Sequence, residues 1–344
     1  MKMNDKKIWI KYHRKNDMRE YCIYRMNQIS HTILKKPYKK KANCFAGKRL
    51  LTYEETNKVI ADAIEQQVPF WTGRYGMTEL KLIVQEINKQ WGLPNTVNEN
   101  LQQLCNNAGF FLNKNGDNES KMFTHMMLEA SKNIDLHAIW PMNMEDYFVK
   151  FCESSEVQLT NLWKLEPWYL YSCVEKHIPL WSSALKGKKV LVIHPFADTI
   201  ETQYNQKREK IFEKICPSDE ILPQFELHTI KAVQTIAGQE DNRFQTWFDA
   251  LQYMVDECNK VDFDVAIIGC GAYGFPLANE VKKMGKVAIH LGGATQLMFG
   301  IMGKRWEHPA FQEFRDRVVN DSWTRPMMAD QVKGMDKVEN ACYW

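Results

Sequence analysis

One continuous stretch, residues 263–293, constrains the fold of this chain more than any other. It reads FDVAIIGCGAYGFPLANEVKKMGKVAIHLGG, so two short apolar runs flank a glycine turn and a helical segment. Apolar runs of this kind are typical of strands buried on both faces, and a strand, a helix and a second strand in succession form a βαβ unit. The stretch therefore predicts part of an open, mainly parallel α/β sheet.

The same alternation of strands and helices occurs in two other parts of the chain. LTYEETNKVIADAIEQQ (51–67) predicts a capped helix, and VPFWTGR (68–74) predicts a strand that a second helix follows. Further on, VLVIH (190–194) and FELHTI (225–230) predict two more strands, each followed by a helical pattern. Together these elements predict a doubly wound α/β fold, with helices on both faces of the sheet.

The sequence predicts three segments. Residues 1–48 form a basic N-terminal arm, residues 49–322 a single α/β domain, and residues 323–344 a C-terminal extension that packs irregularly. Between residues 95 and 185 there are helical patterns but no clear strand run longer than four residues. This part is therefore predicted to be an α-helical insertion within the domain.

The positive charge of the chain is concentrated at its front. Residues 1–50 contain 15 Lys and Arg against three acidic residues, a net of +12, whereas the rest of the chain carries −9. A basic segment such as KKPYKKK (35–41) is attracted to anionic lipid head groups or to nucleic acid, by about 1 kcal/mol per basic residue near a charged surface. We expect an anionic membrane surface, and no nucleic acid, as the partner of residues 1–48; a solvated arm is the alternative.

The sequence shows neither a membrane-spanning segment nor a secretory signal. No apolar run approaches the roughly 18 to 20 residues that cross a bilayer, and the first residues are mostly basic and polar. The nine cysteines include no C-x-x-C pair, which favours reduced thiols over a zinc ribbon or a disulfide framework. A cytoplasmic location is therefore expected, and the basic arm would make the protein membrane-peripheral.

The turn IIGCGAYG carries the glycine fingerprint G-x-G-x-x-G at Gly269, Gly271 and Gly274. Such a turn lets the backbone approach a phosphate closely, and the helix after it favours an anion at its first turn. A nicotinamide site also needs an acid about 20 residues further on, where this chain has HLGG (290–293). We therefore expect no NAD. A turn needed only for packing and a site for a sugar-nucleotide diphosphate are the other interpretations.

The strand before the second helix also ends in a turn, and this turn carries side chains that are suited to binding or catalysis. Ligands of a doubly wound sheet bind at the carboxyl ends of its strands. In GRYGMTEL, Arg74 is suited to pair with a phosphate, and Glu79 to bind a divalent ion or accept a proton. The alternative is that Arg74 and Glu79 pair with each other. His194, before Pro195, is expected to act as a base or as a donor to phosphate, with a histidine satisfied by backbone groups as the alternative.

Three segments together resemble the GT-D fold and GT-D-like glycosyltransferases of bacterial surface-polysaccharide and glycoprotein loci. They are GRYGMTEL, LEPWY followed by ALKGKKVLVIHPFADTI, and DVAIIGCGAYGFPLANEVKKMGKVAIHLGGATQLMFGIMGKRW. They frame roughly residues 50–310. The resemblance implies a Rossmann-like domain that moves a sugar from a nucleotide-diphosphate donor to an acceptor hydroxyl.

The resemblance also implies a metal-binding Asp-x-Glu pair in the first turn, which this chain carries only in part. It has Met-Thr-Glu there, so only Glu79 matches. One carboxylate holds Mg²⁺ or Mn²⁺ weakly unless other oxygens assist, and Thr78, Asp198 and Asp241 are the candidates. Arg74 could instead take over part of the charge-neutralising role of the metal.

These considerations give one set of expected site residues on the strand-end turns. Glu79 and His194 are the expected catalytic groups, and Glu79 is also the expected metal ligand. The expected contacts to the nucleotide sugar are Gly73, Arg74, Tyr75, Gly76, Thr78, Pro195, Gly269, Gly271, Tyr273, Gly274, His290, Gly292 and Gly293. The expected partners are a nucleotide-diphosphate sugar and a glycan or lipid-linked acceptor in surface polysaccharide biosynthesis. An NAD(P)-dependent oxidoreductase and a non-catalytic sugar-nucleotide-binding protein are the alternatives.

Overall fold

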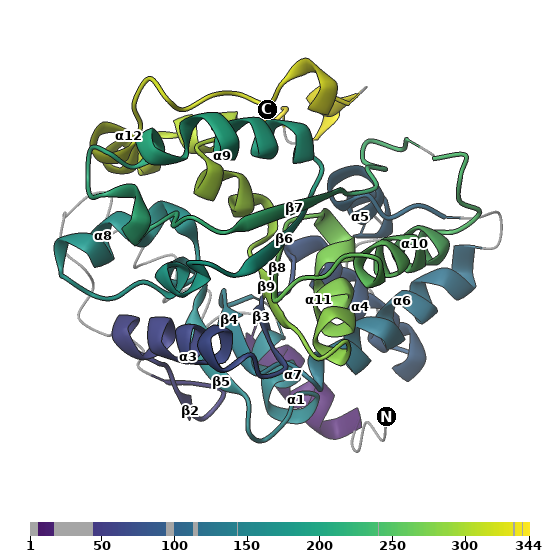
Figure 1. Ribbon diagram of the computed structural model, residues 1–344. Coiled ribbons are helices and arrows are strands. Elements are labelled where there is room, and N and C mark those ends of the chain that lie inside the picture. Colours follow the sequence, from purple (N-terminus) through teal and green to yellow (C-terminus); the bar gives the residue numbers. More distant parts are fainter. Residues whose placement is uncertain are drawn as a thin grey trace.

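A parallel sheet forms the centre of the protein in the computed structural model, which describes residues 6–16, 44–93, 100–112, 116–142, 144–239, 241–332, 334–338 and 340–344. Its seven strands pair in the order β5-β4-β3-β9-β8-β6-β7 (Figure 1). They are β3 (Phe70–Gly73), β4 (Leu136–Ile139), β5 (Gln158–Asn161), β6 (Lys189–His194), β7 (Glu226–Lys231), β8 (Val265–Ile268) and β9 (Val287–His290). Every pair in this sheet is parallel, so the predicted doubly wound α/β fold is confirmed. A separate hairpin joins β1 (Cys44–Phe45) to β2 (Lys48–Arg49).

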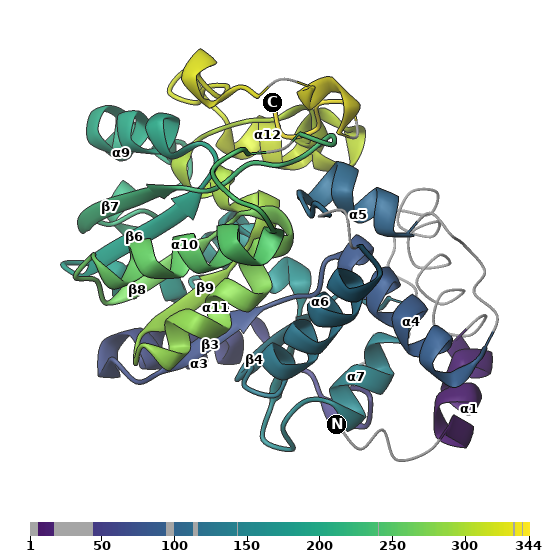
Figure 2. The same ribbon diagram turned by 90° about the vertical axis from the view of Figure 1, so that its right-hand side faces the viewer.

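Helices cover both faces of the sheet, and each face has its own apolar core. One face is covered by α4 (Met77–Trp91), α5 (Asn100–Ala108), α6 (Gly116–Ser131), α7 (Glu145–Phe151), α10 (Trp247–Asn259) and α11 (Gly274–Lys283), several of which Figure 2 shows side by side. The other face is covered by α3 (Tyr53–Gln66), α8 (Leu170–Glu175), α9 (Ala197–Ile211) and α12 (Gln312–Val318). The strands are buried on both sides, which explains their continuous apolar runs.

Capping side chains explain where two of these helices begin. Before α3, the hydroxyl of Thr52 accepts the backbone N–H of Glu55 (3.2 Å), and the Glu55 carboxylate accepts the backbone N–H of Thr52 (2.8 Å). Thr246 and Asp249 form the same reciprocal pair before α10. Both pairs satisfy N–H groups that the start of a helix would otherwise leave without partners.

Residues 95–185 are not the α-helical insertion that the sequence predicted. They contain β4 and β5, which extend the sheet beyond β3 through parallel pairs such as Gly73 with His137. Each strand is four residues long and includes a buried polar side chain, His137 or Thr160, so neither stands out as an apolar run. This part of the chain therefore contributes two of the seven strands, at one side of the sheet.

The first described helix belongs to the body of the protein. α1 (Lys6–Asn16) buries Trp9 completely; its indole Nε1 donates to Asn88 Oδ1 (2.8 Å), and its ring meets Tyr147 edge-on with 4.8 Å between centroids. The predicted N-terminal arm is therefore not a separate arm over residues 6–16. The basic run KKPYKKK lies outside the described residues, so its expected membrane partner stays a prediction.

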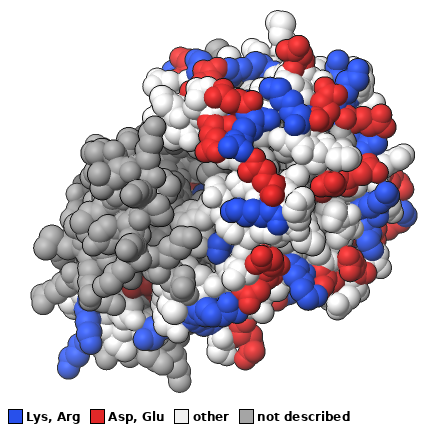
Figure 3. All heavy atoms as spheres, turned by 90° about the vertical axis from the view of Figure 1, so that its left-hand side faces the viewer, with Lys and Arg blue, Asp and Glu red and all other residues white. Residues whose placement is uncertain are grey.

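The surface gives two further observations on that expectation. On the face in Figure 3, Lys and Arg side chains alternate with Asp and Glu over the described part of the surface. Among the helices that the structure describes, none combines the length and the apolar character needed to span a bilayer.

The connections at the carboxyl edge of the sheet create the place for a site. β6 continues into α9 on one face, whereas the neighbouring β8 continues into α11 on the other. Where adjacent strands send their helices to opposite faces, a crevice opens beyond their carboxyl ends, and ligands of doubly wound folds bind there.

Candidate active site at the carboxyl edge of the sheet

Four neighbouring strands bring the predicted turns together. β3, β9, β8 and β6 are adjacent, and their carboxyl ends lead to Arg74, His290, Gly269 and His194. The turns are in tight contact: a Cβ atom placed on Gly269 would lie 2.7 Å from His194 Cδ2 and 2.5 Å from the carbonyl oxygen of Gly292. The four turns therefore lie together on one edge of the molecule.

His290 fills the space between two of these turns. A Cβ atom on Gly73 would lie 2.8 Å from His290 Cβ, and one on Gly274 would lie 2.3 Å from His290 Nε2, so both positions need glycine to admit the ring. Burial, together with the positive charge of Arg74, lowers the pKa of His290 to about 3. The ring is therefore neutral at neutral pH and adds no second charge beside Arg74.

Packing inside the protein accounts for the glycines of the fingerprint. Gly269 lies against the turns after β6 and β9, and Gly274 lies against His290. Gly271, at φ +58°, has the carbonyl oxygen of Ala108 2.5 Å from its Cβ position. A larger residue at any of these three positions would collide with its neighbours. These glycines are thus explained without a phosphate, and they are no evidence for one.

Arg74 provides the positive charge of this edge. Its side chain is half-buried, Nη1 donates to the carbonyl oxygen of Tyr75 (3.1 Å), and Nε is buried with no hydrogen-bond partner among the described residues. Within the described part of the chain no carboxylate pairs with it, and Glu79 instead accepts a hydrogen bond from Thr78. Nη2 lies 3.2 Å from the Cβ position of Gly292. The guanidinium therefore faces a glycine turn with its charge uncompensated, as an anion site requires.

His194 is oriented as a hydrogen-bond donor. Its Nδ1 accepts the backbone N–H of Phe196 (3.0 Å), so the proton of the neutral ring is assigned to Nε2. Burial lowers the pKa of His194 to about 3, which keeps the ring neutral. With Nδ1 occupied and Nε2 protonated, the ring has no free nitrogen to accept a proton. Of the two roles expected for His194, the geometry favours the donor over the base.

Glu79, the expected catalytic carboxylate, lies in the same turn as Arg74. It is buried at the start of α4, its Oε2 accepts a hydrogen bond from Thr78 Oγ1 (2.9 Å), and it folds back over Gly76, whose missing side chain leaves room for it. Gly76 and Thr78 are partly exposed, as is Pro195 in the turn after β6.

The acids near this edge do not fit a metal site built from protein ligands alone. The expected helpers of Glu79 are each paired with a cation, Asp198 with Lys231 (2.7 Å) and Asp241 with Arg243 (2.6 Å). Across the described ranges, no group of three or more His, Cys, Asp or Glu side chains is arranged to hold a metal ion. Because Mg²⁺ and Mn²⁺ prefer several oxygen ligands, Glu79 alone would hold such an ion weakly.

Two of the expected contacts, Tyr75 and Tyr273, are core residues. Tyr75 is fully buried and stacks on Phe275 (4.7 Å between centroids). Tyr273 stacks on Trp247 at the same distance, and its hydroxyl lies 3.1 Å from Thr235 Oγ1. Both rings pack in the helical layer over one face of the sheet, so neither is available to a ligand at the edge. Both tyrosines were expected to contact the ligand because each precedes a glycine of a strand-end turn, but that position in the sequence does not show which way the ring points.

Two residues of this edge were not predicted. Trp140 follows β4, and the guanidinium of Arg74 lies over its ring, 5.9 Å from the centroid. Thr295, which is fully buried, donates to the carbonyl oxygen of Gly292 (2.8 Å) and fixes that turn. The strand-end rule would have identified Trp140 if β4 had been recognised as a strand, whereas Thr295 has no sequence signal of its own.

A second group of buried ionisable residues lies one strand beyond β3. His137 Nδ1 is 2.7 Å from Glu153 Oε1, its Nε2 is 3.2 Å from Glu145 Oε1, and all three side chains are fully buried. Burial alone would lower the pKa of His137, but the two carboxylates outweigh burial and raise it to about 10. Glu145 also accepts the backbone N–H groups of Trp140 (3.2 Å) and Met142 (3.1 Å). The charged His137 group therefore holds the loop that carries Trp140.

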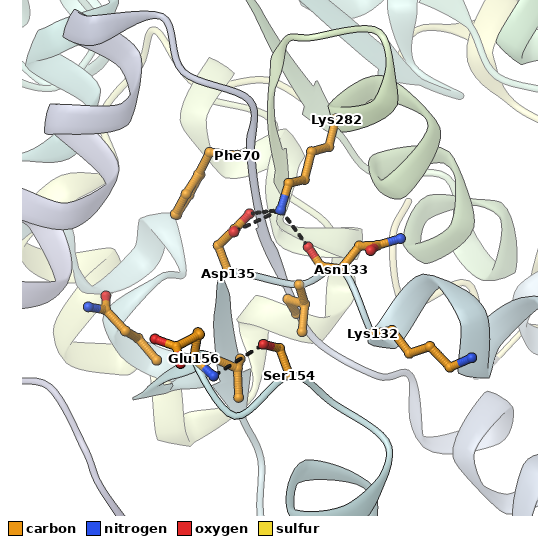
Figure 4. Close-up of a pocket in the computed structure, with 10 residues that line it drawn as sticks. Phe70, Lys132, Asn133, Asp135, Ser154, Glu156 and Lys282 are labelled. Carbon is orange, nitrogen blue, oxygen red and sulfur yellow. Dashed lines mark hydrogen bonds and ion pairs between the residues drawn. The ribbon is translucent and has the colours of Figure 1, made fainter. Parts of the chain in front are cut away.

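A hollow of about 340 Å³ lies at the opposite, amino edge of the sheet, beside Phe70 at the start of β3 (Figure 4). Two lysines line it. Lys282 points at Asp135, 2.7 Å away, and Lys132 pairs with Glu129. Lysines that are already paired attract a phosphate weakly, so this hollow is not the candidate site.

The sheet and its carboxyl edge define the class of protein. A seven-stranded parallel sheet with helices on both faces is a Rossmann-like fold, and Arg74, His194 and His290 lie at its strand ends. Within this class, the GT-D fold-like domain family matches residues 51–298, most of the chain. The chain therefore belongs to the GT-D-like family, as its sequence predicted.

Comparison with individual proteins adds little to the family assignment. A selenomethionine-substituted solved structure of a domain of unknown function 1792 (DUF1792) is 10% identical, with 80% of this chain and 91% of that chain covered and a TM-score of 0.37. At that level the likeness defines neither the fold nor the activity of this chain. No curated protein matches the chain. Membership of the family supports a function of glycosyltransferase type, which implies a nucleotide-sugar donor and an acceptor.

Proposed function

We propose that this protein is a glycosyltransferase that moves a sugar from a nucleotide-diphosphate donor to a hydroxyl of a glycan or lipid-linked acceptor in surface polysaccharide biosynthesis. The family supports the type of reaction. The observation that carries the proposal is Arg74, whose guanidinium has no carboxylate partner among the described residues and faces the Gly292 turn at the carboxyl edge.

The proposed chemistry follows from where charge develops. When the sugar leaves, negative charge builds up on the departing diphosphate, and positive charge develops at the anomeric carbon. Arg74 would neutralise the diphosphate, and the Nε2–H of His194 would donate a hydrogen bond to it. His194 and His290 are neutral, so Arg74 supplies the positive charge among these three residues. Glu79, in the same turn as Arg74, would accept the proton of the acceptor hydroxyl.

The location of the enzyme is a further part of the proposal. The net charge of +12 over residues 1–50 would hold it at the cytoplasmic membrane surface, where lipid-linked acceptors reside. Stronger co-sedimentation with anionic than with neutral liposomes is the result that supports this; equal binding to both removes it.

Protection against thermal unfolding tests the donor site. We expect UDP or GDP, measured separately, to raise the Tm, and NADH to leave it unchanged. Arg74→Gln should weaken the binding of the protecting nucleotide about 10- to 100-fold, because a hydrogen bond to a charged group contributes about 1.5–3 kcal/mol. Arg317→Gln, in a surface ion pair of α12, is the control and should bind as the unmodified protein does.

Turnover in a second pair of variants separates an enzyme from a non-catalytic binding protein. Glu79→Gln should bind the nucleotide normally but lose donor hydrolysis, and Glu65→Gln, an exposed carboxylate on α3, should keep it. Nucleotide protection should persist in EDTA, because the described acids near Arg74 form no metal site of their own. Protection by NADH alone, or normal nucleotide binding by Arg74→Gln, would contradict the proposal.

A further inference from the structure

The C-terminal extension docks on the candidate site, although it lies outside the family match. In Figure 1 the last residues, in yellow, run beside α9 and α12. Their anchor is Asp330, which is almost fully buried: its Oδ2 accepts the backbone N–H (2.8 Å) and the hydroxyl (2.6 Å) of Thr199. Lys231, the last residue of β7, lies 2.8 Å from Asp330 Oδ1.

This anchor occupies a position that favours an anion. Thr199 belongs to the first turn of α9, where the N–H groups and the helix dipole attract negative charge, and α9 directly follows β6 at the carboxyl edge of the sheet. The hydroxyl of Thr199 also accepts the backbone N–H of Met327 (2.9 Å). Since a carboxylate of the same chain fills this position, the Arg74 side of the edge is the part left for a diphosphate.

The end of the extension reaches the surroundings of His194. The indole Nε1 of Trp344 donates to the backbone carbonyl of Asp330 (3.4 Å). The Trp344 ring meets Phe196 edge-on (5.4 Å between centroids), and Phe196 meets the ring of His194 in the same way (4.9 Å). The buried anchor and the last residue of the chain thus form one packed unit with the turn after β6.

Tyr343 supports the turn after β9 from the side of Gly293. Its Cε1 lies 2.1 Å from the Cβ position of Gly293, so the ring is packed directly on that backbone. Gln296 Nε2 donates to the carbonyl oxygen of Tyr343 (3.1 Å), and the guanidinium of Arg305 lies over the Tyr343 ring, 4.4 Å from its centroid. Gly293 was expected to contact the nucleotide sugar; in the structure the ring of Tyr343 packs on it.

We propose that the described residues of the C-terminal extension, 323–332, 334–338 and 340–344, form a strap that completes the donor site, with Asp330 and Tyr343 as positioning residues. The inference rests on the proposed function. Asp330 anchors the strap to α9, and Tyr343 holds the Gly292–Gly293 turn at its distance from Arg74. The strap acts on the position of the turn and not on the reacting atoms, so its loss affects donor affinity more than the chemical step.

The test compares variants that remove and keep the ring of Tyr343. Tyr343→Ala should raise the KM for the donor, and weaken binding of UDP or GDP, about 5- to 10-fold, with kcat at saturating donor within about two-fold of the unmodified protein. Tyr343→Phe keeps the ring and should behave as the unmodified protein does.

The second pair of variants addresses the anchor. Asp330→Asn should show the same rise in KM and, in addition, faster trypsin cleavage within residues 323–344, because the strap is released. Asp336→Asn removes an exposed carboxylate of the same segment and should change neither.

The outcomes separate this inference from the function on which it rests. If the unmodified protein binds neither UDP nor GDP, the proposed function fails and the strap fails with it. If it binds one of them, and Tyr343→Ala and Asp330→Asn bind it equally well, the strap is overturned while the function stands. A large and equal loss of kcat in Tyr343→Ala and Tyr343→Phe would also overturn it, because the hydroxyl would then act in the chemistry.

Discussion

His137 of β4 and His290 of β9 lie on opposite sides of β3, and their electrostatic surroundings differ in sign. His137 pairs in register with Gly73, and His290 packs against Gly73 from the other side. Both imidazoles are fully or almost fully buried. His137 lies between two carboxylates and is positively charged, whereas His290 lies beside the guanidinium of Arg74 and is neutral.

The difference teaches what each region can do. Around His137 the positive charge is neutralised inside the protein, so the group stabilises the fold and holds the loop after β4. The charge that acts on His290 is that of Arg74. No carboxylate among the described residues forms an ion pair with Arg74. The same substitution made at each histidine therefore tests whether His137 is charged and His290 is neutral.

The largest effect is expected when each histidine is replaced by leucine. His137→Leu leaves two buried carboxylates without a cation, which should lower the free energy of unfolding by about 3–5 kcal/mol. His290→Leu removes no ion pair and should cost clearly less. Urea denaturation measures both. Adding Glu145→Gln and Glu153→Gln to His137→Leu should restore part of the loss, and equal losses in the two single variants would break the comparison.

The pH dependence of stability should have opposite signs in the two regions. His290 has a folded pKa of about 3, below the unfolded value of about 6.5, so only the unfolded state takes up its proton as the pH falls between these values. Stability is then lost on acidification, by about 2–3 kcal/mol between pH 7 and 4.5. His290→Gln should flatten this slope.

His137 behaves in the opposite way because its folded pKa is raised. Its contribution is fully present below pH 6.5 or so and is lost as the pH rises toward about 10, since the unfolded state releases the proton first. Compared with the unmodified protein, His137→Leu should therefore be destabilised most below about pH 6.5 and progressively less as the pH rises toward 10. Urea titrations from pH 4 to pH 10 would follow both slopes; the same sign of slope for both residues would count against the assignment of charge.

The smallest effect concerns the glycine that faces Arg74. Gly292 has φ +59°, so alanine there should cost about 1–2 kcal/mol of stability. Gly92 has φ +62° with no other atom within 4 Å of its Cβ position, and Gly92→Ala should cost a similar amount. Only Gly292→Ala should also weaken nucleotide protection, because its methyl group meets Arg74 Nη2. Weaker protection in both variants would reduce the effect to lost stability.

Much of the sheet could be predicted because its strands follow simple rules. β6, β8 and β9 are continuous apolar runs, and glycine turns or helical patterns mark where they end. β4 and β5 could not be predicted in the same way. His137 interrupts the apolar pattern of β4, and Thr160 interrupts that of β5. Each polar group can be buried because a tertiary partner satisfies it: Glu153 for His137 and Thr56 for Thr160.

For the candidate site, the sequence could predict only those residues that follow the carboxyl end of a recognisable strand. The rule that ligands bind at carboxyl ends led to Arg74 and His290, which the structure brings together. The same rule could not predict which tertiary contact requires a glycine at each of these positions. Gly293 is bare because of Tyr343, which comes 50 positions later, and such a contact has no local signal.

The ring of His290 has a mechanical consequence for the whole molecule. Three residues of β3 are paired with β9, and beside this seam the imidazole is wedged between Gly73 and Gly274. Separating β3 from β9 would require breaking the hydrogen bonds between the two strands and, at the same time, moving the His290 ring out from between Gly73 and Gly274. We therefore expect the two halves of the sheet to move as one rigid body, which leaves the admission of substrates to the surface loops.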